Sequence, residues 1–265
     1  MHTAKELADQ LWPALKEQLE KPAYRLIPSS GTPTLTGTKI GGTPYWPKGK
    51  PYPTAKDGSP LYLVAQLNMA DFPEGDLLPK AGVLQFFVKA DEQYGFDWKE
   101  GSADGYRVVH HGAVDEASAN ADVPKASEEE AAYLPFCGSF AMRVESMRCM
   151  PCVYEEVFVD ALDQELARRG LDLDEGTRDD LIQEMANFTE SDGSHVLGYP
   201  FTAQGNPVEE GDPHDVLLLN LDGTDWLDDG NFLEFGDSGY ANFFIAKDAL
   251  LRGDFADVLY TWDCY

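Results

Sequence analysis

The chain has few cations and no long hydrophobic run, and each shortage excludes a class of protein. Only 20 Lys and Arg stand against 47 Asp and Glu, which gives a net charge of −27 over 265 residues. Phosphate backbones and anionic lipids attract clustered Lys and Arg, so we expect binding neither to nucleic acid nor to an anionic membrane. No apolar run approaches the roughly 20 residues that a membrane span needs. The opening MHTAKELADQLW indicates a helix rather than a signal peptide, so we expect a cytoplasmic protein.

Cysteine is also scarce, with four residues that are too few and too irregularly spaced for a secreted disulfide scaffold. Cys149 and Cys152 form a C-x-x-C motif, which could be a redox dithiol or half of a zinc site. A zinc site would need a second such pair, and a thioredoxin-like motif would need a clean helix start after the first cysteine. The sequence therefore predicts incidental thiols, with no metal and no cofactor.

The acidic residues are concentrated in the last three-fifths of the chain. Residues 1–100 carry 11 Lys and Arg against 12 Asp and Glu, whereas residues 101–265 carry 9 against 35. Because these acids are scattered among apolar residues, folding is not in doubt. They either keep the protein soluble or form an acidic face that steers a basic protein partner.

Hydrophobic periodicity and turn residues predict an α+β fold with mostly antiparallel sheets, an N-terminal helix and a mid-chain helical segment. Leu7, Leu11, Leu15 and Leu19 form one apolar stripe of a helix over residues 3–20. The other expected helices cover 157–169, with Gly170 as C-cap, and 177–188, and the capping-box spacing of Ser127 and Glu130 predicts a short helix that starts there. The expected strands cover 61–67, 83–88, 106–110, 140–144, 216–221, 240–245 and 258–262.

Three sequence blocks recur in the same order, which predicts that the sheets are built from two tandem structural repeats. Gly42-Thr-Pro-Tyr45 matches Gly198-Tyr-Pro-Phe201, and the later blocks match at nearly the same spacing. The later pairs are Leu63–Asn68 with Leu217–Asp222, and Gly82–Val88 with Gly239–Ile245. We expect one domain over 1–265, with repeat one at about 39–91, a helical insertion at about 125–190 and repeat two at about 195–265.

At these blocks the chain resembles the YwqG-like bacterial proteins, a family usually described as a domain of unknown function. The residues that carry the resemblance are Lys39–Pro47, Pro60–Gln66, Gly82–Phe87, His195–Pro200, Phe235–Gly239, Asn242–Phe244 and the ending Phe255–Cys264. The resemblance implies a mixed α and β fold with duplication, and it brings no catalytic residues. Some relatives look as though they belong to toxin–immunity neighbourhoods, which suggests a binding role.

Five residues are the candidate binding residues: Trp46, Gln66, Gln85, Trp226 and Asp237. The two tryptophans are either rigid anchors for a partner or carbohydrate, or caps on a core. Gln66 and Gln85, together with Asn220 and Asn242, are amides in apolar strands. They form either a buried hydrogen-bonded junction or the polar lining of a groove. Asp237 lies between glycines, where it either locks a tight turn or binds a ligand.

The acidic stretch 222–237 is the other candidate for chemistry, but it fails the EF-hand template, because Gly236 falls where the loop needs a Glu. A different cation site from Asp228, Asp229 and Asp237 stays open beside turn-forming aspartates. His110 and His111 are adjacent in an expected strand and so face opposite sides. No P-loop, G-x-G-x-x-G or H-E-x-x-H motif occurs. We therefore predict no catalytic residues.

Two functions follow as hypotheses. The first is a non-catalytic protein-binding module, of an inhibitor or immunity-like kind, that uses its acidic face against a basic protein. The second is a small-ligand or carbohydrate-binding protein, or a weak hydrolase, with a groove between the two repeats.

Overall fold

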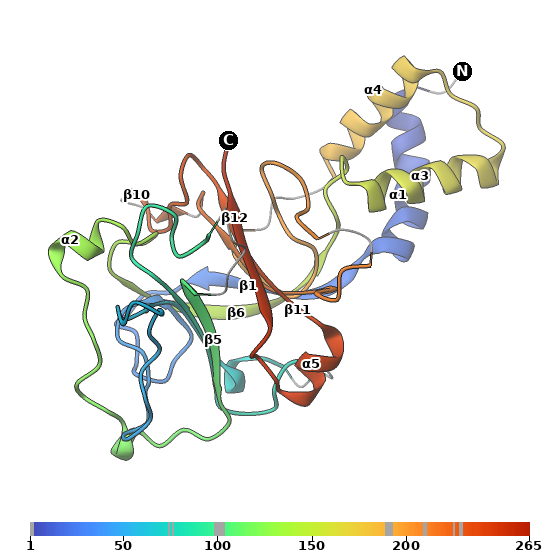
Figure 1. Ribbon diagram of the computed structural model, residues 1–265. Coiled ribbons are helices and arrows are strands. Elements are labelled where there is room, and N and C mark those ends of the chain that lie inside the picture. The colour runs from blue at the N-terminus through green and yellow to red at the C-terminus, as the bar shows by residue number, and fades with distance from the viewer. Residues whose placement is uncertain are drawn as a thin grey trace.

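The fold is dominated by one ten-stranded sheet that curls on itself (Figure 1). The computed structural model describes residues 3–73, 75, 77–97, 104–188, 193–208, 211–224, 226–227 and 230–265. Neighbouring strands are antiparallel throughout this sheet. In spatial order they are β12 (Val258–Asp263), β11 (Tyr240–Ile245), β8 (Val216–Asp222), β7 (His195–Val196), β1 (Lys21–Pro28), β6 (Ser139–Cys149), β2 (Lys39–Gly41), β3 (Tyr62–Asn68), β4 (Val83–Val88) and β5 (Tyr106–His111).

Five α-helices accompany the sheet in the described residues, so the expectation of an α+β fold with antiparallel strands is confirmed. They are α1 (Ala4–Leu19), α2 (Glu128–Ala131), α3 (Glu156–Arg169), α4 (Glu175–Ala186) and α5 (Lys247–Arg252). Two short 3₁₀ turns cover Met69–Asp71 and Glu116–Ser118, and a separate pair joins β9 (Trp226–Leu227) to β10 (Gly230–Asn231). Within the described ranges, no helix is long and apolar enough to cross a membrane.

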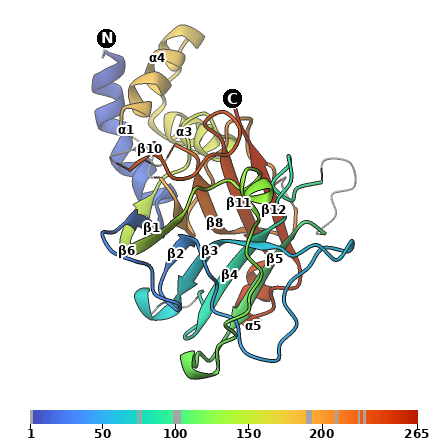
Figure 2. The same ribbon diagram turned by 90° about the vertical axis from the view of Figure 1, so that its left-hand side faces the viewer.

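The two edge strands of the curled sheet, β5 and β12, meet at a seam (Figure 2). The Tyr106 hydroxyl of β5 donates a hydrogen bond of 2.9 Å to the Val258 carbonyl oxygen of β12. The rings of Tyr106 and Tyr260 lie 5.1 Å apart across the same seam. The edges are therefore joined here by side chains.

Aromatic side chains from strands far apart in sequence fill the inside of the sheet. The ring of Phe86 on β4 lies 5.0 Å from that of Phe243 on β11, and Phe243 stacks on Tyr260 at 4.5 Å. All three are essentially inaccessible to solvent. Burying one such side chain is worth roughly 1.5–3 kcal/mol. These aromatic contacts therefore hold β4, near one end of the sheet, against β11 and β12 at the other end.

Helices α1, α3 and α4 form a second body at one side of the sheet, which we call the helical lobe (Figure 1). Its core is separate from that of the sheet and buries the leucine stripe predicted for the first helix. Thr3 and Glu6 form a capping box that starts α1, and Gly170, at φ +66°, ends α3 as predicted. A lobe with its own core can present its outer face without disturbing the sheet.

The centre of the sheet was not predicted. Residues 21–28 had no assigned element, yet they form β1, and the short strand expected at 140–144 is part of the eleven-residue β6. Residues 125–190, expected as a helical insertion, contain β6 as well as helices at 128–131, 156–169 and 175–186. β1 and β6 are about 120 residues apart in sequence, and neither has the apolar run that marks a buried strand.

Gly82 tests how closely the start of β4 approaches the end of β5. It has φ +91°, and an added Cβ would lie 1.9 Å from the His111 carbonyl oxygen. Gly82→Ala should lower the free energy of unfolding by at least about 2 kcal/mol. Gly49→Ala is the control, because Gly49 has φ +83° with nothing within 4 Å, so it should lose only about 1 kcal/mol. Equal losses in urea denaturation would show that the backbone conformation alone requires glycine at position 82.

Candidate functional site

The backbone of the turn Gly42–Tyr45 is hydrogen-bonded by Gln66 and Gln85, the two amides that the sequence predicts as candidate binding residues. Gln66 Oε1 accepts a hydrogen bond from the Tyr45 backbone N–H at 3.0 Å. Gln85 Nε2 donates to the Tyr45 carbonyl oxygen at 2.7 Å and to Gln66 Oε1 at 2.8 Å. Both glutamines are fully buried. They position the turn and line none of the hollows described below.

Trp46, the third candidate, is also buried, at 3% exposure. Its Nε1 donates to the Lys50 carbonyl oxygen at 3.0 Å, and its ring lies 4.9 Å from that of His111. Because its N–H is hydrogen-bonded and its ring is buried, Trp46 supports the loop around Lys50 and is not available as an anchor on the surface.

Lys39 is a buried cation that sequence reasoning missed. Its side chain is 2% exposed, and Nζ donates to the carbonyl oxygens of Thr34, Leu35 and Thr43 at 2.7–2.9 Å. Burial lowers the pKa of Lys39 to about 8, against a smaller opposing effect of Glu116. The only signal in the sequence was a lysine beside the apolar Ile40 and a turn. This lysine ties the loop before β2 to the turn after it.

Two hollows meet at Gly42 and Thr43. The first, of about 450 Å³, lies between the turn and the segment 124–138, and Tyr52, Tyr62 and Phe136 form much of its wall. The second, of about 570 Å³, lies over the loop 31–35 and is lined by Lys39 and Ser139. The turn that Gln66 and Gln85 fix is therefore the shared wall of two concave surfaces.

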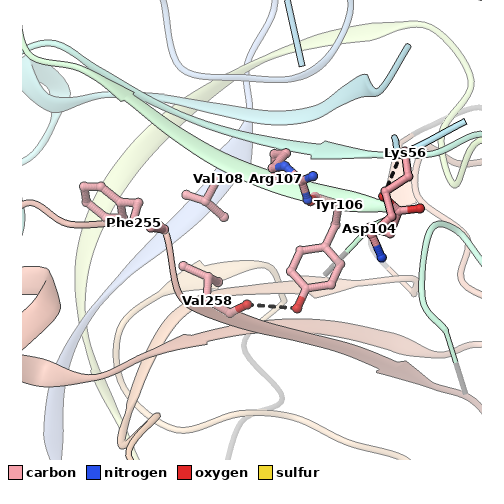
Figure 3. Close-up of a pocket in the computed structure, with 8 residues that line it drawn as sticks. Lys56, Asp104, Tyr106, Arg107, Val108, Phe255 and Val258 are labelled. Carbon is pink, nitrogen blue, oxygen red and sulfur yellow. Dashed lines mark hydrogen bonds between the residues drawn. The ribbon is translucent and has the colours of Figure 1, made fainter. Parts of the chain in front are cut away.

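A third hollow, of about 330 Å³, lies on the seam between β5 and β12 (Figure 3). Tyr106 and Val108 of β5 face Val258 of β12, and Figure 3 shows the hydrogen bond from Tyr106 to Val258 that crosses it. Lys56 and Arg107 add cationic side chains to its lining.

A second turn, Gly198–Phe201, repeats the amide contacts of the first. Asn220 Oδ1 accepts from the Phe201 backbone N–H at 2.9 Å, and Asn242 Nδ2 donates to the Phe201 carbonyl oxygen at 2.8 Å. Both asparagines are buried. Among the described residues, Asn220 Nδ2 and Asn242 Oδ1 have no partner, and at the first turn Gln85 Oε1 has none either, whereas Gln66 Nε2 donates to the carbonyl oxygens of Leu35 and Gly37.

The remaining candidates lie away from the first turn. Trp226 pairs with Asn231 between β9 and β10, and its side chain lies outside the described residues. Asp237 is exposed, and its carbonyl oxygen accepts from the Tyr265 N–H at 3.2 Å. Asp225, Asp228 and Asp229 of the acidic stretch also lie outside the described residues.

Over the described ranges, no group of three His, Cys, Asp or Glu side chains is arranged to hold a metal ion. Cys149 and Cys152 are both reduced, and buried Cys149 accepts a hydrogen bond from the Tyr199 N–H at 3.4 Å.

Helices α3 and α4 of the helical lobe lie in a strongly acidic part of the chain. Residues 155–188 contain eleven Asp and Glu against three Arg. All three arginines are paired with acids of the lobe itself: Arg168 and Arg169 with the buried Glu165, and Arg178 with Asp163. The exposed acids are Glu156, Asp160, Asp163, Asp172, Asp174, Glu175, Asp179 and Asp180.

His111 makes stability depend on pH. It is 3% exposed, both ring nitrogens lack a partner among the described residues, and burial together with the Lys50 charge lowers its pKa to about 4. The unfolded chain, with the ordinary pKa near 6.5, therefore binds this proton more readily, so stability falls as the pH drops from 6.5 to 4.

Between pH 7 and pH 4, the wild type should lose on the order of 3 kcal/mol more unfolding free energy than His111→Phe. Urea denaturation of both proteins at the two pH values measures the difference. Phenylalanine keeps a ring between Tyr45 and Trp46, so parallel losses in the two proteins would mean that His111 is not the titrating group.

No curated protein matches this chain in sequence. The model of one protein family does match, over residues 38–264, and that family is described as a domain of unknown function, DUF1963. The matched span covers the whole sheet except β1, and it includes the hollows of about 450 and 330 Å³ and the lobe helices α3 and α4, whereas the loop 31–35 of the other hollow lies before it. The chain belongs to the DUF1963 family.

Proposed function

We propose that this chain is a non-catalytic cytoplasmic binding protein whose helical lobe takes a basic protein partner, as an inhibitor or immunity-like protein would. The observation that carries the proposal is the charge of the lobe, whose arginines are all neutralised from within. Seven exposed carboxylates of residues 155–188 are left without an arginine partner to act together on approaching molecules. Such a face speeds the encounter with a basic surface and repels acidic ones.

Two exposed apolar side chains lie within this acidic face. Tyr154 is 63% exposed just before α3, and Val157 is 44% exposed in its first turn. The Tyr154 hydroxyl donates to Gln183 Oε1 of α4 at 3.2 Å, which fixes the ring across the two helices. A fixed tyrosine surrounded by charges is typical of the residues that dominate binding energy at protein interfaces.

The acidic face is tested by neutralising three carboxylates in the lobe. A partner captured from cytosol by the wild type at low salt should be released at high salt. The triple variant Asp160→Asn, Asp179→Asn, Asp180→Asn should capture it at least about tenfold more weakly. Quantitative mass spectrometry of the eluates measures the loss.

The matched control removes three exposed acids far from the lobe: Asp122→Asn, Glu128→Gln and Glu129→Gln. It changes the net charge equally and should capture the partner as the wild type does. An equal loss in both variants would mean that net charge acts without a defined face, and a partner that resists salt would contradict the electrostatic part of the proposal.

We also propose that the sheet consists of two copies of one unit, within a single domain of the YwqG-like kind. The strand order supports this, since β12-β11-β8-β7-β1 has the same pattern of pairings as β5-β4-β3-β2-β6 from the other end. β3 bulges at Val64, between Leu63 and Ala65, and β8 bulges at the matching Leu218. A bulge is a local irregularity that two unrelated hairpins would not share at one position.

The two turns support the duplication in more detail. Lys39 Nζ donates to the Thr43 carbonyl oxygen, and at the matching positions His195 Nε2 lies 2.8 Å from the Tyr199 carbonyl oxygen. Gly41, two positions after Lys39, has φ +66°, and Leu197, two positions after His195, has φ +63°. Leu197 has this conformation at a cost in strain that glycine avoids. If the sheet is duplicated in this way, β5, which lies beyond the predicted end of repeat one at about residue 91, corresponds to β12.

A second candidate function is the binding of a small ligand or carbohydrate on the seam, as the hypothesis of a groove between the repeats requires. The hollow of about 330 Å³ between β5 and β12 favours it. Its mixed lining of aromatic, aliphatic and cationic side chains and the Asp104 carboxylate suits a polar molecule with one apolar face.

A panel of mono- and disaccharides, each assayed for its effect on the melting temperature, tests this candidate. A true ligand should raise the melting temperature of the wild type, because it binds only the folded state. Ala256→Trp, at the exposed rim of the seam hollow, should abolish the rise, whereas Ala131→Trp, at a different hollow, should keep it. A rise that survives Ala256→Trp would place the sugar elsewhere.

A further inference from the structure

The imidazole ring of His195 has both of its nitrogens against carbonyl oxygens. Nδ1 lies 2.8 Å from the carbonyl oxygen of Gly193, and Nε2 lies 2.8 Å from that of Tyr199. A carbonyl oxygen can only accept a hydrogen bond, so each contact requires a hydrogen on the ring nitrogen. A neutral imidazole carries one such hydrogen, whereas the imidazolium cation carries two. The two contacts together are therefore those of a protonated ring.

His195 is fully buried, and burial by itself opposes a positive charge. The chain nevertheless buries a cation in the same manner at Lys39, whose Nζ donates to three carbonyl oxygens, among them that of Thr43. In both cases one of these oxygens belongs to the residue four positions further along the chain. Hydrogen bonds from a charged donor are stronger than neutral ones, so converging carbonyl oxygens take the place of water around each cation.

The charged groups on the neighbouring strands act on His195 in both directions. Arg25 of β1 lies opposite His195, and Glu145 of β6 lies opposite Arg25. On β8, Asp222 is on the same face as Asn220, which lies opposite His195. Arg25 disfavours a proton on His195, whereas the two carboxylates favour it. The titratable groups Lys21 and Cys149 contact Tyr199, and Glu190 and Asp192, which precede β7, lie outside the described residues.

Tyr199, which His195 contacts, also contacts two chain segments that connect the sheet to the helical lobe. Its hydroxyl donates to the carbonyl oxygen of Leu19, the last residue of α1, at 2.8 Å. Its backbone N–H donates to Sγ of Cys149, the last residue of β6 before α3, at 3.4 Å. The ammonium group of Lys21, the first residue of β1, lies 3.9 Å from the centre of the Tyr199 ring. One residue therefore links both segments to the imidazole.

We propose that His195 is a buried imidazolium at neutral pH, and that its proton holds the helical lobe on the sheet through Tyr199. When the proton is lost, one ring nitrogen directs a lone pair at a carbonyl oxygen, and that contact can no longer be a hydrogen bond. The turn 198–201 then moves, and Tyr199 loses its fixed position against Leu19 and Cys149. This inference concerns how the lobe is attached and does not depend on what the lobe binds.

The direction of the pH dependence follows from the proton. The folded chain binds it more tightly than the unfolded chain, in which histidine titrates near pH 6.5. The stabilisation by His195 is therefore complete below pH 6.5, and it is lost as the pH rises through the value at which the folded chain releases the proton. This dependence is opposite in sign to that of His111, which destabilises the folded chain at acidic pH.

The protonation is tested by NMR of the full wild-type chain labelled with ¹⁵N-histidine. The His195 ring is identified among the five histidines by its contact with the Phe201 ring, whose centre lies 5.2 Å away. At pH 7 both ring nitrogens should show the chemical shift of a protonated nitrogen, and one of them should lose it at alkaline pH. A single protonated nitrogen at pH 7 would contradict the proposal.

The link from His195 to the turn is tested by alkylation of the buried Cys149, with Cys152 as the reference thiol in the same chain. His195→Gln has an uncharged amide that cannot donate from both ends. At pH 7 it should raise the ratio of Cys149 to Cys152 alkylation by iodoacetamide about fivefold. His195→Lys, which keeps a cation as at position 39, should stay within about twofold of the wild type. Peptide mass spectrometry measures both ratios.

The same ratio follows the proton in the wild type. It should rise when the pH passes the value at which NMR shows His195 losing its proton, and it should not rise there in His195→Lys. The His195→Lys variant also controls for the ionisation of the two thiols, which increases with pH in every variant.

Tyr199→Phe separates the lobe contact from the charge. It removes the hydroxyl that bonds to Leu19 and keeps the backbone contacts of the turn with His195 and Cys149. His195 should stay protonated, while the Glu20 N–H, which bonds to the Lys16 carbonyl oxygen at the end of α1, should exchange with deuterium about fivefold faster. Unchanged exchange of this amide would show that Tyr199 does not hold the lobe.

The proposal is overturned by a neutral His195 at pH 7, or by equal Cys149 alkylation in His195→Gln and the wild type. It is also overturned if His195→Lys exposes Cys149 as much as His195→Gln does, because the charge then has no role. The NMR measurement uses the wild type alone, so it decides the protonation even if a variant fails to fold.

Discussion

The pairing of β1 with β6 is the contact on which the rest of the molecule depends. Eight residue pairs run from Lys21 opposite Cys149 to Pro28 opposite Met142. On one side β1 leads through β7 to the second half of the sheet, and on the other β6 leads through β2 to the first half. At the Lys21 end the same two strands connect to the helical lobe, since α1 precedes β1 and α3 follows β6. One antiparallel ladder therefore joins three bodies.

The turns Gly42–Tyr45 and Gly198–Phe201 are supported by buried amides in different ways. In the first half the longer amides of Gln66 and Gln85 reach each other as well as the turn, and they reach the loop 35–37. In the second half Asn220 and Asn242 hold the turn but leave a donor and an acceptor without partners among the described residues. Gln85 Oε1 also lacks a partner among the described residues, but Gln66 and Gln85 bond to each other, so the first turn has one more supporting side-chain hydrogen bond than the second. The two larger hollows lie around this turn.

The sequence predicted what depends on local pattern. The strands around Gln66, Gln85, Asn220 and Asn242 followed from short apolar runs between turn residues, and the amides within them were correctly singled out as unusual. The leucine stripe of α1 and the Gly170 cap are equally local. What failed depends on partners distant in the chain: β1 and the full length of β6 are strands because each pairs with the other.

The surroundings of the site residues likewise could not be predicted where they depend on contacts distant in the chain. Burial of Trp46 depends on His111, 65 positions away, and burial of Lys39 on a loop that carries no strong pattern. Tyr52 lies in a segment of glycine and proline that gave no sign of a wall, and its hollow closes only when residues 124–138 fold over it. The helical acids could be counted from the sequence, but that their arginines are neutralised inside the lobe required the geometry.

The seam between β5 and β12 has a consequence for solubility. Exposed sheet edges are templates on which another chain can add a strand, and this sheet is rich in the apolar strands that aggregate most readily. Here the two edges lie against each other, so each shields the other from a foreign strand. Because that protection comes from the Tyr106 hydroxyl and a few rings rather than from a backbone ladder, it can be lost by local opening without unfolding of the sheet. The shielding of both edges therefore depends on a few side-chain contacts along one line, among them those of Tyr106 with Val258 and Tyr260.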